Sequence, residues 1–144
     1  MANRYVINAK KVMGFSPTGN ENNYISRLLI DDQSVGSRNL VMNHFTLLPG
    51  KSTSPGSHPS PFEEVYYILR GKGLLTLGGE KGVQYEVTAD TAAYIPCDTV
   101  HELKNIGEEP LVMLTMMPFL PTPGANGLYD ERKKQWGTSY REVE

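Results

Sequence analysis

The sequence predicts an all-β fold, a sandwich or a barrel, in a single domain. Apolar and polar residues alternate with a period of two from about residue 24 to residue 117, and turn residues interrupt this alternation at short intervals. No stretch with a helical period is long enough to form a helical layer. At 144 residues the chain has the size of one domain that can bury a proper core.

Short segments rich in Val, Ile, Tyr, Thr and Leu are the predicted strands. In chain order they are RYVINAKKV (4–12), NLVMNHFTLL (39–48), EEVYYILRG (63–71), GLLTLGG (73–79), YEVTAD (85–90), AAYIP (92–96) and PLVMLTMM (110–117). The first of these is a strand that two subunits can exchange. Glycines in 71–73 and 78–82 supply the positive φ angles that tight hairpin turns need.

Composition argues against several classes of partner. The net charge of -2 gives no reason to expect a nucleic acid. The single cysteine, Cys97, cannot build a disulfide framework. No apolar run approaches the ~20 residues that span a bilayer, and the N-terminus lacks the apolar stretch of a signal peptide. We therefore expect a cytoplasmic protein with no membrane partner.

The C-terminal part differs in character from the rest of the chain. Residues 118–127 are rich in proline and glycine, and residues 128–144 are polar, charged and aromatic. We expect a barrel over 1–118 and an irregular extension over 119–144 that packs on the barrel or on a partner. Trp136 and Tyr140 favour docking, because an unfolded tail has little reason to carry large aromatic residues. Residues 119–129 also form a plausible lid.

Two segments, 50–71 and 89–105, carry a shared pattern of histidine, carboxylate and turn residues. The residues of this pattern are His58, Glu64 and Gly71 in the first segment and Pro96, His101 and Asn105 in the second. Together they resemble the paired motifs of the cupin superfamily. The resemblance covers about residues 40–117 and implies a double-stranded β-helix, or jelly-roll, barrel in which the motifs converge on one metal. It also implies a homodimer.

The first motif can be counted in two ways. Backwards from the glycine at 71, His58 and Ser60 take the two positions where cupins have histidine. Forwards from the glycine at 50, Gly56 and His58 take them. Either count leaves one histidine missing, and the sequence does not choose between them. In the second motif, Asp98 replaces the turn glycine.

The resemblance implies a metal site made by His58, Glu64 and His101, with Ser60 as a weak fourth ligand through water. Two imidazoles and one carboxylate suit Fe(II), and also Mn, Ni, Co or Zn. The absence of a thiolate ligand argues against a closed structural zinc site. We expect one divalent transition metal with an open coordination position.

Strand parity suggests which neighbours accompany the metal. Alternate residues of a strand share a face, so Tyr66 lies beside Glu64 if the glutamate points inward, while Glu63 faces the other way. His44, on the preceding strand, replaces the missing ligand or acts as a general base if it also faces inward. Tyr66 and His44 are thus the candidate catalytic residues. Asn105 is expected to support the hairpin of the second motif.

The cupin barrel hosts many chemistries, so the function has to come from the site. We expect a mononuclear metal enzyme in which the ion acts as a Lewis acid on a small carboxylate or carbonyl substrate, for isomerisation, decarboxylation or elimination. One alternative is an Fe(II)-dependent dioxygenase. Another is a binding module for a sugar or an effector that has no catalytic activity.

Overall fold

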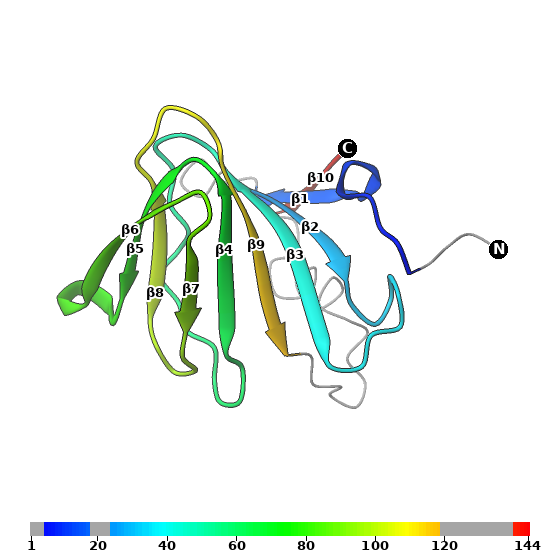
Figure 1. The fold of residues 1–144 in the computed structure, drawn as a ribbon, viewed down its shortest axis with the longest axis horizontal. Helices are drawn as coiled ribbons and strands as arrows, with labels where there is room; N and C mark the ends of the chain where they lie inside the picture. Colours follow the sequence, from blue (N-terminus) through cyan, green and yellow to red (C-terminus); the bar gives the residue numbers. More distant parts are fainter. Residues whose placement is uncertain (1–4, 18–23, 119–139) are drawn as a thin grey trace.

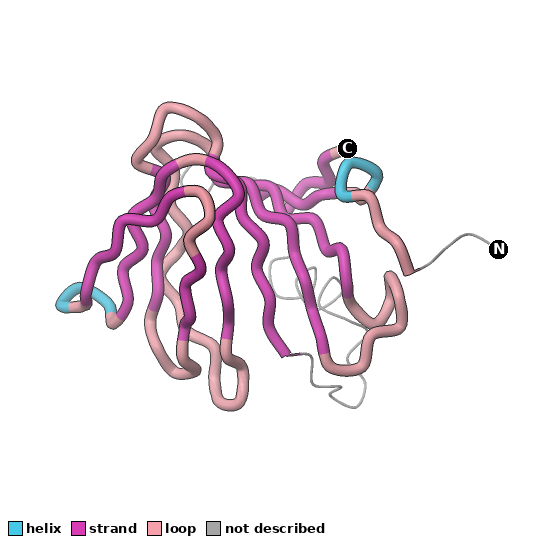
Figure 2. Tube along the Cα trace, viewed as in Figure 1, coloured by secondary structure: helices cyan, strands magenta, loops and turns pink. Residues whose placement is uncertain are grey.

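The computed structural model describes residues 5–17, 24–118 and 140–144, and these form two antiparallel β-sheets (Figure 1). The larger sheet has the order β10-β1-β2-β3-β9-β4-β7, and the smaller one has the order β6-β5-β8. Helical structure in the described residues is limited to two short 3-10 turns, η1 (Ala9–Lys11) and η2 (Gly79–Lys81), as Figure 2 shows. The all-β jelly-roll prediction is confirmed.

Most strands lie where the alternating pattern predicts them. Their bounds are β1 (Gly14–Pro17), β2 (Tyr24–Ile30), β3 (Leu40–Leu47), β4 (Glu64–Arg70), β5 (Lys72–Leu77), β6 (Val83–Thr88), β7 (Ala92–Ile95), β8 (His101–Asn105), β9 (Leu111–Pro118) and β10 (Tyr140–Val143). Gly71 joins β4 to β5 with a φ of +92°. A Cβ atom there would lie 2.7 Å from Leu111 Cα, so only glycine fits this turn.

The main core lies between the two sheets. Buried and half-buried residues alternate along β3, β4, β8 and β9, so each strand gives one face to the interior. Burying a leucine side chain in this way contributes roughly 1.5–3 kcal/mol. The core residues are Phe45, Leu47, Tyr66, Ile68, Leu75, Val87, Ile95, Leu103, Leu111 and Met113.

The loop between β3 and β4 covers the edge of the small sheet. Its backbone runs antiparallel to β8, where Thr53 N donates to Leu103 O at 2.9 Å and Asn105 N donates to Lys51 O at 2.9 Å. The Thr53 hydroxyl also accepts a hydrogen bond from Leu103 N at 2.9 Å. These bonds pair an edge that would otherwise expose unsatisfied backbone groups. They also fix the loop beside the second motif.

The N-terminal strand is not where the sequence predicts it. Residues 5–13 contain the turn η1, which Asn8 caps by accepting a hydrogen bond from Lys10 N at 3.0 Å, and the strand β1 begins only at Gly14. A short polar side chain that caps a turn competes with extended structure. The predicted exchangeable strand over 4–12 is therefore wrong for the described residues 5–12.

The C-terminus joins the larger sheet. Strand β10 pairs antiparallel with β1, with Gly14 opposite Val143. Arg27 of β2 donates hydrogen bonds to the carbonyl oxygens of Val12, Val143 and Glu144, which ties the segment just before β1 and the C-terminal strand to the sheet. The extension is thus a strand, not irregular, over 140–143. The predicted lid at 119–129 and the docking of Trp136 lie outside the described residues.

No helix in the described ranges is long and apolar enough to cross a lipid bilayer.

Candidate metal centre

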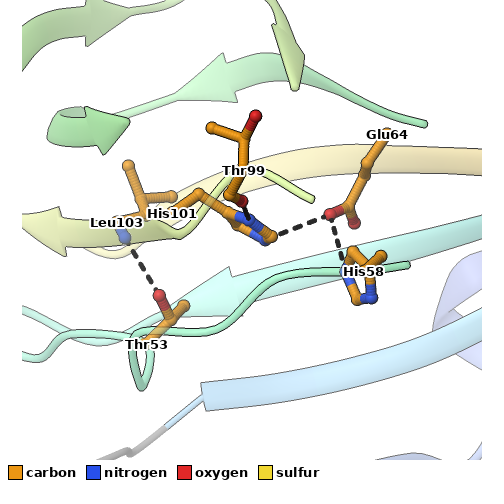
Figure 3. A network of polar contacts seen from close by, with 6 residues as sticks. All are labelled: Thr53, His58, Glu64, Thr99, His101 and Leu103. Carbon is orange, nitrogen blue, oxygen red and sulfur yellow. Dashed lines mark hydrogen bonds and ion pairs between the residues drawn. The ribbon is translucent and has the colours of Figure 1, made fainter. Parts of the chain in front are cut away.

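Three side chains from separate elements meet inside the barrel. His58 comes from the loop before β4, Glu64 begins β4, and His101 begins β8 (Figure 3). Glu64 Oε2 lies 3.2 Å from His58 Nε2 and 3.4 Å from His101 Nε2. One ligand atom from each of the three residues lies within 4.8 Å of the others. The structure therefore brings together the three residues that the two motifs predict as metal ligands.

Strand parity places Glu64 in the interior. Glu64, Tyr66 and Ile68 are buried, and the intervening Val65 and Tyr67 are only half-buried. The predicted parity is therefore confirmed. Glu63 lies on the exposed side, where its carboxylate accepts a hydrogen bond from the Tyr94 hydroxyl at 2.6 Å.

Backbone bonds hold His58 next to His101. Gly56 and His101 exchange two hydrogen bonds, with His101 N donating at 2.8 Å and Gly56 N donating at 3.2 Å. Asp98 N also donates to His58 O at 2.7 Å. Asp98 stands where cupins have a turn glycine, and it adopts a φ of 60°. Aspartate is one of the few residues that enter this left-handed region at modest cost.

The tautomer of His101 is fixed by a backbone carbonyl. His101 Nδ1 lies 3.0 Å from Thr99 O, an acceptor, so Nδ1 carries the proton and donates it. In the neutral imidazole, Nε2 then presents a lone pair to Glu64 Oε2. A carbonyl that orients the far nitrogen is the usual support for a histidine that binds a metal. The sequence motif names His101 but gives no sign of the Thr99 carbonyl.

Glu64 Oε2 has no hydrogen-bond partner in the part of the chain that the structure describes, and its contacts are the ion-pair contacts with the two histidines. It is sealed from solvent and makes no hydrogen bond, although two imidazole nitrogens lie within 3.4 Å of it. Two acceptors that face each other repel unless a proton or a cation lies between them. Atoms bound at about 2.0–2.1 Å to one ion lie about 3.0–3.4 Å apart, so this donor set fits a metal.

The pKa values of Glu64 and His101 show that the carboxylate and the imidazole affect each other. Burial raises the pKa of Glu64, but its contacts with His101 and His58 outweigh burial and lower this pKa overall. Burial lowers the pKa of His101, but Glu64 and the Thr99 carbonyl outweigh burial and raise it overall. The site therefore favours a positive charge beside the carboxylate. A bound cation would also place a positive charge beside this carboxylate.

Tyr66 lies beside the cluster, as strand parity predicts. Its ring meets the His101 ring edge to face, with centroids 6.2 Å apart. Burial, and then the charge of Glu64, raise the pKa of Tyr66 well above its usual value. The phenol consequently keeps its proton and acts as a hydrogen-bond donor.

Two other predicted residues do not join the cluster. His44 is half-buried on the face of β3 opposite to the buried Asn43 and Phe45, and it lies opposite Arg27 and Leu114 in the sheet. Burial and then Arg27 lower the pKa of His44. The expectation that His44 faces inward as a ligand or a base is therefore not met. Ser60 is exposed on the loop, and it does not share the buried position of Glu64.

The fold and the site define the class of protein. A jelly-roll barrel with a His-Glu-His cluster inside it is the architecture of a cupin. Residues 43–117 match the family model described as Cupin domain, and the chain belongs to this family.

Known proteins resemble the chain over part of its length. The uncharacterized protein MJ1618 of Methanocaldococcus jannaschii is 40% identical over 80 residues, which are 56% of this chain and 50% of that protein. The polyketide synthase CurC of Streptomyces cyaneus is 31% identical over 98 residues, which are 67% of this chain and 61% of that protein. The chain thus spans about half to three fifths of the length of these two relatives.

Solved structures show the same fold. The polyketide cyclase RemF of Streptomyces resistomycificus superposes with a TM-score of 0.66 at 26% identity, over 78% of each chain. A predicted oxalate decarboxylase of Thermotoga maritima superposes with a TM-score of 0.68, over 80% of this chain and 99% of that one. At 19% identity the second likeness shows the fold alone.

We expect the metal-free protein to lose stability as the pH rises above about 6.5, the usual pKa of histidine. The lowered pKa of Glu64 stabilises the fold above the carboxyl's usual pKa, and this stabilisation disappears only as the pH falls through the folded value. The raised pKa of His101 stabilises the fold below about 6.5, the usual value, and this stabilisation disappears as the pH rises through the folded value. The change is on the order of a few °C.

Thermal unfolding after treatment with a chelator measures this pH dependence. His101→Gln is the control, because it removes the titrating group and should flatten the profile above pH 6. A melting temperature that rises over this range in the wild type, relative to the control, would contradict the assigned coupling.

Proposed function

We propose that the chain is a mononuclear metal-dependent cupin enzyme for a small substrate with carboxylate or carbonyl oxygens. Its chemistry is of the isomerase, decarboxylase or lyase type. The observation that carries this proposal is the sealed carboxylate oxygen of Glu64, which has no hydrogen-bond partner in the described chain and faces the Nε2 atoms of His58 and His101. Such an arrangement is costly unless a cation completes it.

Each residue has a separate part in this proposal. His58, Glu64 and His101 hold the ion, and a bound divalent ion supplies a Lewis acid that stabilises negative charge on a substrate oxygen. The His58 side chain is 39% exposed, whereas that of Glu64 is 8% exposed, so the substrate reaches the site from the His58 side. Tyr66 donates a hydrogen bond to a substrate oxygen, because its phenol stays protonated at neutral pH.

The names of the relatives support proton-transfer chemistry. RemF is called a polyketide cyclase, and it superposes over 78% of this chain. The dimethylsulfoniopropionate lyase DddW of Ruegeria pomeroyi is 34% identical over 88 residues, which are 61% of this chain and 53% of that protein. Ring closure and elimination both develop negative charge on the carbon next to a carbonyl group and on the carbonyl oxygen. An electrophile stabilises this negative charge.

Metal content is the first test of the proposal. Protein purified without chelator or affinity nickel is expected to carry about one equivalent of a transition metal, measured by plasma mass spectrometry. Glu64→Ala should lose most of it, because the variant removes the only negative ligand of the cluster. Glu63→Ala is the matched control, since this neighbour points to the opposite side of the strand and bonds to Tyr94.

The outcome also separates the proposal from its alternatives. Iron as the only metal that supports activity, with consumption of dioxygen, would favour a dioxygenase. A protein that stays metal-free after attempts to load Fe, Mn, Ni, Co and Zn would contradict an enzyme of this type and favour a binding module. The homodimer and the cytoplasmic location stay predictions, and a monomeric mass by light scattering would contradict the first of them.

A further inference from the structure

Polar side chains divide the interior of the barrel into two apolar parts. The main core lies on one side of them, and a second cluster of Leu28, Val41 and Met117 lies on the other side. Along β3, Asn43 comes between Val41 of the second cluster and Phe45 of the main core. Along β9, Thr115 takes the same position. A polar layer thus crosses a core that is apolar above and below it.

The polar layer is in register across three neighbouring strands. Tyr66 of β4 lies opposite Thr115 of β9, and Thr115 lies opposite Asn43 of β3. The three residues are 5%, 8% and 3% exposed, respectively. We call Tyr66, Thr115 and Asn43 the polar row. Adjacent strands lie about 4.8 Å apart, so this row spans roughly 10 Å. Because Tyr66 is two residues from Glu64 on the same face, the row begins beside the metal centre.

The row offers more hydrogen-bond donors than the described chain uses. Asn43 Oδ1 accepts a hydrogen bond from Ser26 Oγ at 2.9 Å, which leaves the Asn43 Nδ2 group pointing elsewhere. Among the described residues, neither this amide group nor the hydroxyls of Tyr66 and Thr115 have a hydrogen-bond partner. Buried polar groups in native proteins nearly always have a partner in the protein, in ordered water or in a ligand. The donor groups of this row therefore need a hydrogen-bond acceptor.

The three donor groups are also not sealed. In the described ranges, the sealed side-chain atoms without a partner are Asp32 Oδ1 and Glu64 Oε2, and no atom of the row is among them. The residues are buried as a whole, yet their polar atoms keep some contact with space of the size of a water molecule. Water or a ligand inside the barrel can accept their hydrogen bonds.

We propose that Tyr66, Thr115 and Asn43 form a second subsite, which binds a neutral hydroxyl or carbonyl oxygen of the substrate. The inference rests on the proposed function, because the same substrate reaches the metal with its carboxylate or carbonyl end. The ligand is thus a small polyoxygenated molecule whose oxygen atoms are separated by about 5–10 Å. The two apolar clusters pack against its carbon skeleton.

The charge of the buried residues restricts the second oxygen to a neutral group. The buried residues of the described chain include neither lysine nor arginine. A second carboxylate or a phosphate would enter this layer without a countercharge, which is costly. Two hydroxyls and an amide N–H instead match the lone pairs of carbonyl and hydroxyl oxygens. Ser26 acts as a positioning residue, because its hydroxyl sets the orientation of the Asn43 amide.

Thermal unfolding of Thr115→Val tests the subsite without any metal. Valine has the shape of threonine and lacks its hydroxyl. If that hydroxyl serves a ligand, its loss should leave the melting temperature unchanged or raise it by about 1–5 °C. A fall of more than about 5 °C would overturn the proposal, because the hydroxyl would then support the fold. Thr46→Val is the control, on the opposite face of β3.

Binding of matched ligand pairs tests the specificity of the subsite. The probes are phenylpyruvate with 4-hydroxyphenylpyruvate, and 2-oxopentanoate with 5-hydroxy-2-oxopentanoate, titrated calorimetrically into zinc-loaded protein. In the wild type and in Thr46→Val, the hydroxylated member of at least one pair should bind about 3–10-fold more tightly. Thr115→Val and Asn43→Leu should each remove this preference. They should leave the metal content and the affinity for the unhydroxylated acid unchanged.

The outcomes separate the subsite from the proposed function. A wild type that prefers neither hydroxylated acid, or a preference that persists in both variants, would overturn the subsite while the metal proposal stands. A wild type that binds no zinc, or no 2-oxo acid, would contradict the proposed function. In that case the melting temperature of Thr115→Val still decides whether the row supports the fold or faces a ligand.

Discussion

Replacing His101 with alanine is expected to abolish stoichiometric metal binding. His101 Nε2 faces Glu64 Oε2 at 3.4 Å, and the Thr99 carbonyl holds the imidazole in the tautomer that binds a metal. Loss of an outer-shell partner alone costs 10–100-fold in affinity, so loss of the ligand itself should cost on the order of 100-fold or more. Competition with a chromophoric chelator measures the zinc affinity of the wild type and of the variant.

His44→Ala is the matched control for this experiment. It removes a histidine of similar chemistry from the opposite face of β3, away from the cluster. Its zinc affinity should stay within about 2-fold of that of the wild type. Full stoichiometry and unchanged affinity in His101→Ala would show that the second motif is a remnant of the fold and does not bind metal.

The barrel and the histidine-glutamate cluster could be predicted because the motif residues occupy fixed positions on strands. Glu64 begins β4 and His101 begins β8, so their side chains point inward once each strand is assigned. The two counts of the first motif disagree on the loop, yet His58 belongs to both. Backbone bonds between Gly56 and His101 then decide where this loop lies. Such bonds depend on the partner strand and leave no pattern in the sequence.

The face of β3 could not be predicted in the same way. Val41, Phe45 and Leu47 face inward, but Met42 and Leu48 make the other parity look equally apolar. The sequence therefore left His44 free to face either side. The polar layer could not be predicted either, because a single polar residue within an apolar strand is ordinarily interpreted as facing solvent.

The strands β1 and β10 could not be predicted, because partners distant in sequence decide their structure. β1 is only four residues long and pairs with β10, which lies more than a hundred residues later. Neither segment has an alternating pattern long enough to predict a strand alone. Nothing in the sequence indicates that the Arg27 guanidinium donates to the carbonyl oxygens of Val12 and Val143. Tertiary contacts of this kind override local propensity.

Replacing Asn105 with alanine is expected to destabilise the fold by about 2–4 kcal/mol. The Asn105 side chain is buried, and its Nδ2 donates to Leu47 O and to Glu109 O, both at 2.9 Å. Its Oδ1 accepts a hydrogen bond from Gly107 N, also at 2.9 Å. Alanine leaves all three backbone groups without these partners. Chemical denaturation at pH 7 measures the change in the free energy of unfolding.

The control for this prediction is Asn39→Ala, which changes an exposed asparagine just before β3 and should stay within about 0.5 kcal/mol of the wild type. Asn105 lies four residues beyond His101 on β8 but contacts the end of β3 and the turn before β9, not the metal cluster. The folded variant should therefore keep its metal content. Loss of metal without loss of stability would contradict this separation. It would mean that Asn105 positions His101 and does not mainly close the hairpin.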